Sequence, residues 1–171
     1  DTPMGITVAQ TQELIDLVKS IQPDCLLSGR TGNHMGDYMT TGDNFIPRLP
    51  YEDPWEIPAT VNDTWGFNKY DTNWKSADHI ISLLLKIISR GGNYLLNVGP
   101  TADGVVPEKC VEVLNEVGKY VTEKRLYLAN HAIEQGVSVT DACYQSGFRN
   151  YTTFYQAYRN KYHKSPKQAR K

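Results

Sequence analysis

The last fifty residues combine positive charge with tyrosine, which suits binding to a polyanion. Residues 122–171 hold nine Lys or Arg against three Asp or Glu, a net charge of +6. Cationic side chains bind phosphates, and tyrosine can add hydrogen bonds to the nucleic-acid backbone. The segment therefore predicts a DNA-binding surface. An ordinary solvated surface is the alternative interpretation.

The preceding residues carry the opposite charge. Residues 1–121 hold nine Lys or Arg against sixteen Asp or Glu, a net charge of −7, which suits a neutral or cationic ligand. Within them, Arg30 follows one predicted strand and Asn97 ends another. Catalytic groups of α/β folds lie at the carboxyl ends of the strands, so both are candidates for a site at that edge.

The first elements that must position these residues are a helix and a short strand. Apolar residues at helical spacing predict a helix over residues 8–21, with Thr7 as its N-cap and Pro23 beyond its end. Residues 25–27 read as a buried strand. Residues 31–58 are rich in Gly and Pro and read as a long loop, and residues 60–67 as a possible strand.

The following residues alternate between helix and strand. We expect a helix over residues 74–90 closed by Gly91 and Gly92, a strand over 94–98, a turn over 100–104 and a helix over 107–120. This order predicts an α/β fold in which helices cover a parallel sheet. Only three or four strands are visible, whereas a complete eight-stranded barrel needs about 250 residues.

Composition argues against disulfides, a metal site and a membrane span. Cys25, Cys110 and Cys143 are far apart and have neither disulfide nor zinc spacing, so we expect free thiols and no metal or cofactor. The longest apolar block, residues 80–88, contains Ser82 and Lys86 and is too short for a membrane span. No membrane partner is expected, and a reducing, cytoplasmic location is favoured.

Three stretches in the acidic part, residues 1–38, 54–67 and 91–107, together resemble the second half of the catalytic barrel of the α-L-fucosidases, glycoside hydrolase family 29. The resemblance covers residues 1–120. It implies a partial (β/α) barrel, retaining hydrolysis of terminal α-L-fucose, and a fucosylated glycan or small fucoside as ligand. The strands that precede this half in the family are not in the sequence, so we expect impaired turnover and oligomers formed through unpaired sheet edges.

The same resemblance assigns the site. It implies that Asp1 is the nucleophile and Glu56 the general acid/base, because retaining glycosidases use a pair of carboxyl groups about 5–5.5 Å apart. It also implies that Arg30 contacts the sugar and that Trp65 lines its pocket. His34 and Trp55 are further substrate-binding candidates.

Residues 124–171 resemble the second helix-turn-helix of AraC-type transcription regulators. The matching features are Arg125-Leu126 with Ala129, the stretch 138–141, the turn 146–148, Phe154 with Tyr158, and Ser165-Pro166. Ser138 and Asp141 predict a cap, and Gly147 permits the sharp turn. His163 is a departure, because the family often has Gly there.

This second resemblance implies binding of double-stranded DNA through a small all-α segment. Its candidate contacts face phosphates and base edges: Arg149, Asn150, Tyr151, Thr153, Gln156 and Arg159. The sequence thus predicts two domains, residues 1–121 and 122–171. Natural fusion, recombination and a sequence-assembly artefact would all give such a join. The two functional hypotheses are an impaired fucosidase carrying a DNA-binding motif and a DNA-binding module carrying an inactive hydrolase remnant.

Overall fold

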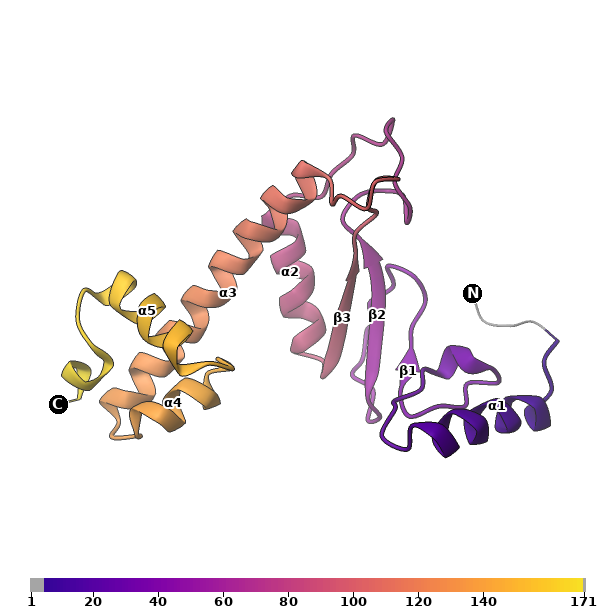
Figure 1. Cartoon of the computed structure of the whole chain (residues 1–171), viewed down its shortest axis with the longest axis horizontal. Coiled ribbons are helices and arrows are strands. Elements are labelled where there is room, and N and C mark those ends of the chain that lie inside the picture. Colours follow the sequence, from indigo (N-terminus) through magenta and orange to yellow (C-terminus); the bar gives the residue numbers. More distant parts are fainter. Residues whose placement is uncertain (1–4, 171) are drawn as a thin grey trace. The chain divides into compact units, whose positions relative to one another are not determined.

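The computed structural model describes residues 5–170 and divides after Val111 into two compact units, the first α/β and the second all-α (Figure 1). Within these residues no helix is long and apolar enough to cross a membrane. The same part of the chain has no cluster of His, Cys, Asp or Glu placed to hold a metal ion. Cys25, Cys110 and Cys143 are free thiols, and burial raises the pKa of the last two.

The first unit begins with helix α1, Val8–Ile21, at the predicted bounds. The Thr7 hydroxyl accepts a hydrogen bond from the Gln10 backbone N–H at 3.2 Å, and the Gln10 side chain accepts one from the Thr7 backbone N–H at 2.9 Å. This reciprocal capping satisfies two N–H groups that the first turn leaves unpaired. The predicted cap at Thr7 is therefore confirmed.

A parallel sheet of three strands follows in the described residues: β1, Met39–Thr40; β2, Trp55–Thr60; and β3, Gly92–Asn97, in the order β1-β2-β3. The strands β2 and β3 pair over six residues, from Trp55 opposite Gly92 to Thr60 opposite Asn97. An isolated parallel bridge joins Ser28 to Tyr38. The three strands therefore run in the same direction, and β2 and β3 end together, whereas β1 ends opposite Glu56 near the start of β2.

Two of the predicted strands are wrong. Residues 25–27 form no strand, and Leu26 is 70% exposed. The strand expected at 60–67 is β2, which ends at Thr60 and begins inside the segment predicted as a loop. Prolines suggested that loop because they cannot donate to a strand ladder. The backbone of Pro58 faces the β1 side of β2, because its carbonyl accepts a hydrogen bond from the Asn44 N–H at 2.9 Å. Strand β1 has already ended at Thr40, so the N–H that Pro58 lacks has no ladder partner to lose.

Helix α2, Ala77–Ile88, lies along one face of the sheet beside β3 (Figure 1). Ser76 caps it, and it contributes Ile87 to a core cluster with Trp55 and Ile57 of β2. The predicted helix, residues 74–90, extends beyond both observed ends. Ser89 is the C-cap, and Gly92, predicted to close the helix, already belongs to β3. A Cβ at Gly92 would clash with the Trp55 ring, so this close approach requires glycine.

Helix α3, Glu108–Glu134, begins in the first unit and ends in the second, well beyond the predicted end at residue 120. It is followed by α4, Val139–Gln145, α5, Tyr151–Tyr162, and a 3-10 turn, Pro166–Ala169. The Ser138 hydroxyl caps α4 by accepting from the Asp141 N–H at 3.1 Å, and Gly147 has φ +89° in the turn before α5, as the sequence predicts.

The second unit closes around one apolar cluster. Its buried members come from α3, α4, the following turn, α5 and the 3-10 turn: Leu126, Ala129, Ile133, Ala142, Cys143, Phe148, Phe154, Tyr158 and Ala169. The Tyr158 hydroxyl is hydrogen-bonded to the Asn130 side chain. Burial of Phe154 and Tyr158 fixes which face of α5 points outward.

Candidate functional sites

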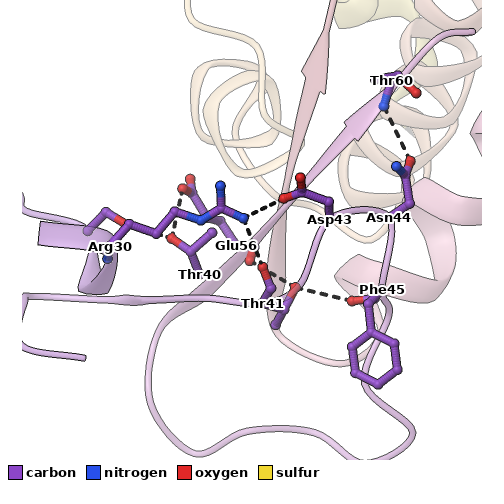
Figure 2. A network of polar contacts seen from close by, with 9 residues as sticks. Arg30, Thr40, Thr41, Asp43, Asn44, Phe45, Glu56 and Thr60 are labelled. Carbon is purple, nitrogen blue, oxygen red and sulfur yellow. Dashed lines mark hydrogen bonds and ion pairs between the residues drawn. The ribbon is translucent and has the colours of Figure 1, made fainter. Parts of the chain in front are cut away.

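A network of polar side chains connects the 3-10 turn at Arg30, the end of β1 and Glu56 near the start of β2, at the edge of the sheet where β1 lies (Figure 2). The Arg30 guanidinium donates to the Asp43 carboxylate at 2.5 Å and to the Thr41 carbonyl at 3.4 Å. The Thr40 hydroxyl lies 3.3 Å from a Glu56 carboxylate oxygen and 2.6 Å from the Ser28 hydroxyl. Side chains from three separate segments therefore meet at this edge.

The sheet-end hollow, an open volume of about 300 Å³, is lined by Arg30, Asp43, Pro58 and Trp65. Arg30 lies in a 3-10 turn capped by Ser28, and Asp43 follows β1. Trp65 lies in the loop after β2 with 42% of its surface exposed. The hollow thus combines a cation, a carboxylate and an aromatic ring, the groups that bind a neutral polyol by hydrogen bonds and stacking.

Glu56 lies beside the hollow on β2 and is half-buried. Burial first, and then the nearby Glu56 carboxylate, raise the pKa of Tyr38, which keeps that phenol protonated. The Arg30–Asp43 pair remains partly open to solvent, so it contributes little to stability and acts mainly by fixing positions.

The other predicted sugar-site residues lie elsewhere. Trp55 is fully buried in the core, where its indole N–H donates to the Arg90 carbonyl at 3.2 Å. Adjacent residues of a strand point to opposite faces, so Trp55 and Glu56 cannot both face the hollow. His34 is exposed on the loop before β1 and is not among the residues lining the hollow. Asp1 lies outside the described residues.

Asp43 is the residue that the sequence reasoning missed. Asp43 comes shortly after β1, and Arg30 comes shortly after the bridge residue Ser28. Both residues therefore follow the carboxyl end of an extended segment. The signal was hidden because β1 has only two residues and lies in the Gly/Pro-rich stretch predicted as a loop.

A second candidate site is the exposed face of α5, opposite Phe154 and Tyr158. A shallow hollow of about 560 Å³ on this helix is lined by Tyr155, Gln156, Arg159, Asn160 and His163. Gln156 and Arg159 are among the predicted contacts, whereas Tyr155, Asn160 and His163 are not. Amide and guanidinium groups of this kind read base edges in a major groove.

The remaining predicted DNA contacts lie near the start of α5. Arg149, Asn150 and Thr153 line a second groove, of about 410 Å³. The Asn150 side chain also caps α5 by accepting from the Thr153 N–H at 3.0 Å. The Tyr151 ring packs against the core and against Phe154, with ring centres 6.0 Å apart, so only part of it is available to a ligand.

A sugar-hydrolase segment joined to a helix-turn-helix is the class of protein that these units define, and comparison with known families specifies both. The family model for alpha-L-fucosidase matches residues 4–125, and a helix-turn-helix domain model matches residues 113–171. The chain belongs to the α-L-fucosidase family through its first part and carries an AraC-type helix-turn-helix in its second. The two matches overlap within α3.

Individual relatives of the first part of the chain are also α-L-fucosidases. An α-L-fucosidase from Dictyostelium discoideum is 30% identical over 109 residues, covering 60% of this chain and 24% of the relative. The tissue α-L-fucosidase of Bos taurus is 37% identical over 95 residues, covering 52% and 20%. The chain thus spans about a quarter or less of these curated relatives.

Solved structures give the same result. An unliganded α-L-fucosidase from Lactobacillus casei matches with a TM-score of 0.63 and 38% identity, covering 70% of this chain and 37% of that one. An α-L-fucosidase from a Vibrio species matches with a TM-score of 0.65 and 32% identity, covering 71% and 22%. A single-residue mutant of AlfC, as the L. casei enzyme is called, has also been solved with 4-nitrophenyl-α-L-fucopyranoside bound.

Proposed function

We propose that the sheet-end hollow is the fucose-contacting part of an α-L-fucosidase site, within a partial (β/α) barrel. The observation that carries this proposal is the meeting of Arg30, Asp43 and Trp65 around one hollow at the carboxyl ends of the strands. Barrel enzymes hold their substrates at this edge. The ligand would be a terminal α-L-fucose on a glycan or small fucoside.

The roles of the carboxyl groups follow from the chemistry of retaining hydrolysis. One carboxylate attacks the sugar and a second group donates a proton to the leaving oxygen. Asp1 is the proposed nucleophile. Glu56 is the proposed acid/base, and Asp43 is the competing candidate because it lines the hollow directly.

We infer that residues 1–171 alone bind fucosides without appreciable turnover. The described sheet ends at β3 on one side, and on the other only an isolated bridge continues it beyond β1. Catalysis requires reacting groups held to within fractions of an ångström, and such open edges do not supply that rigidity.

Titration of the full chain with L-fucose tests binding, with tryptophan fluorescence as the readout. An Arg30→Met variant is expected to bind at least tenfold more weakly than wild type. Arg48→Met, which alters an exposed arginine outside the hollow, should bind normally. A wild-type chain that shows no fucose-dependent change, or an Arg30→Met chain that binds equally well, would overturn the assignment.

Release of 4-nitrophenol from the aryl fucoside tests turnover, and the expected rate is that of the uncatalysed reaction. Robust hydrolysis that disappears in Asp1→Asn would contradict the inference and show that these residues suffice for catalysis. In that case, comparing Glu56→Gln with Asp43→Asn would identify the acid/base.

We also propose that the second unit binds double-stranded DNA through α5. The supporting observation is that the polar face carrying Gln156, Arg159 and Asn160 points away from the core. About four phosphate contacts imply a log–log salt slope near −4, with Kd in the non-specific range of about 10⁻⁴ to 10⁻⁶ M. The acidic first unit should weaken binding further. Such a role implies a cytoplasmic location.

Titration of duplex DNA into the full chain at several salt concentrations tests this second function. An Arg149→Ala/Arg159→Ala variant should bind more weakly and show a smaller slope. Lys167→Ala, which removes a charge from the 3-10 turn outside both α5 sites, is the matched control. Salt-independent binding, or an unchanged double variant, would reject the role of α5.

A further inference from the structure

A groove beside α5 joins the end of one helix to the side of another, wholly within the second unit. This α3–α5 groove, of about 410 Å³, is lined by Thr122 and Arg125 from α3 and by Gly147, Arg149, Asn150 and Thr153 from the turn and α5. No function considered so far uses the α3 side of it.

The position of Arg125 is set by packing. Leu126 and Ala129 are buried in the core, and Arg125 is exposed at the border of this buried face of α3. Its guanidinium lies against the turn before α5. A Cβ at Gly147 would be 3.1 Å from Arg125 Nε and 3.6 Å from its Cζ, and Gly147 has φ +89°. A side chain at position 147 would therefore crowd the guanidinium and require it to shift.

The charge of the groove is uncompensated. The ion pairs Lys19–Asp37 and Arg30–Asp43 both lie in the first unit, outside the groove. Neither Arg125 nor Arg149 has a carboxylate partner within the described residues, 5–170. Two guanidinium groups thus share one groove with the hydroxyls of Thr122 and Thr153.

The side chains of the groove supply its donors for a ligand. The Thr153 N–H is already bonded to the Asn150 side-chain oxygen. Guanidinium groups match a tetrahedral phosphate well because each offers two parallel N–H donors, and threonine hydroxyls can add neutral ones.

We propose that the α3–α5 groove holds a backbone phosphate of duplex DNA. This inference rests on the proposed DNA binding and extends it, because α3 becomes a second contact element beside α5. A phosphate contact carries no base information, so Arg125 would set the position of the unit on the duplex and add affinity for every sequence alike.

The test compares Arg125→Gln with Lys124→Gln in the full chain, on two duplexes of unrelated sequence. Each variant removes one exposed cation from adjacent positions of α3, but Lys124 lies over the Tyr120 ring and does not line the groove. Arg125→Gln should reduce the log–log salt slope by about 0.9, so raising salt from about 50 to about 200 mM weakens wild type about threefold more than the variant. Lys124→Gln should keep the wild-type slope, and circular dichroism should show both variants folded.

Each outcome has a separate meaning. If wild type binds and Arg159→Ala weakens it while Arg125→Gln matches Lys124→Gln, the groove inference is rejected and DNA binding by α5 stands. If Arg125→Gln weakens one duplex much more than the other, the contact reads bases and the phosphate assignment is wrong. If wild type shows no salt-dependent binding, the proposed DNA function itself fails.

Discussion

The two units differ in how completely they bury their apolar side chains. The second unit gathers nine buried residues from every one of its helices into one cluster. In the first unit, which is nearly twice as long, eight apolar residues are buried among those described: Trp55, Ile57, Ala59, Val61, Ala77, Ile80, Ile87 and Cys110. Meanwhile large apolar side chains of the first unit stay exposed on α1, on the segment after it and on β3: Leu14, Leu17, Ile21, Leu26 and Leu95.

The pattern on α1 explains the difference. Leu14, Leu17 and Ile21 repeat at helical spacing and form one stripe, which in a finished fold faces a core. The first unit therefore retains surfaces suited to further packing, whereas the second closes on itself. Family resemblance over a segment does not imply that the segment alone buries its core. We expect the second unit to be the more stable of the two.

The largest expected effect tests this comparison directly. Phe154→Ala removes a fully buried ring and should destabilise the second unit by about 3–5 kcal/mol. All three tryptophans, Trp55, Trp65 and Trp74, lie in the first unit, so their fluorescence should follow that unit alone. Denaturant titration should show a large shift of the helical signal at 222 nm and none of the fluorescence.

Tyr144→Ala is the control for this substitution, because Tyr144 is an aromatic of the same unit with 53% of its surface exposed. It should change stability by no more than about 0.5 kcal/mol. A fluorescence transition that moves together with the helical one in Phe154→Ala would mean that the two units unfold as one, and the comparison would fail.

Alkaline pH should weaken the closed core of the second unit. Burial first, then Tyr162 and Glu134, raise the pKa of Tyr158 to about 12, against about 10 in an unfolded chain. The neutral phenol is thus favoured in the fold, so its stabilising effect is complete below pH 10 and is lost as pH rises towards 12. Urea midpoints at 222 nm should fall across this window, less steeply in Tyr158→Phe. Equal slopes in both chains would contradict the assignment.

The sequence predicted the fold best where local signals and packing agree. Helix α1 was predicted at its bounds from apolar spacing and Thr7, and the turn at Gly147 from the residue type. The sheet was predicted less well. Strand β2 contains Pro58 and β1 has two residues, and both are held by pairing with distant strands rather than by local preference.

The candidate sites show the same limit. Arg30 and Trp65 were predicted and do share the sheet-end hollow, but Asp43 was missed because it depends on β1. Trp55 was named as a substrate-binding candidate, but it is fully buried, and strand geometry sends it and its neighbour Glu56 to opposite faces. Arg125 matched a family motif, but its approach to Gly147 is a contact between residues far apart in sequence.

Each unit has a tyrosine whose hydroxyl group is buried, and the two hydroxyls differ in their hydrogen bonding. The Tyr158 hydroxyl bonds Asn130, whereas the buried Tyr94 hydroxyl finds no partner within residues 5–170. Tyr158→Phe should therefore cost about 1 kcal/mol in the second unit, and Tyr94→Phe should leave the first unit equally or more stable, because it removes an unsatisfied polar group. Midpoints of the helical and fluorescence transitions measure the two effects, and a loss in Tyr94→Phe as large as that in Tyr158→Phe would argue against the difference.

The smallest expected effect concerns the helix caps. Ser138 caps α4, whose Ala142 and Cys143 lie in the closed core, so Ser138→Ala should shift the helical transition of the second unit by about 1 kcal/mol. Thr7 caps α1 with the same chemistry, but that helix leaves its apolar stripe uncovered and should open locally before the sheet unfolds. Thr7→Ala should then speed amide hydrogen exchange along α1 while moving the tryptophan transition by less than about 0.5 kcal/mol. The contrary result is that Thr7→Ala shifts the tryptophan transition as much as Ser138→Ala shifts the helical transition. In that case α1 is coupled to the sheet core as tightly as α4 is coupled to the core of the second unit. The first unit would then unfold more cooperatively than its exposed side chains indicate.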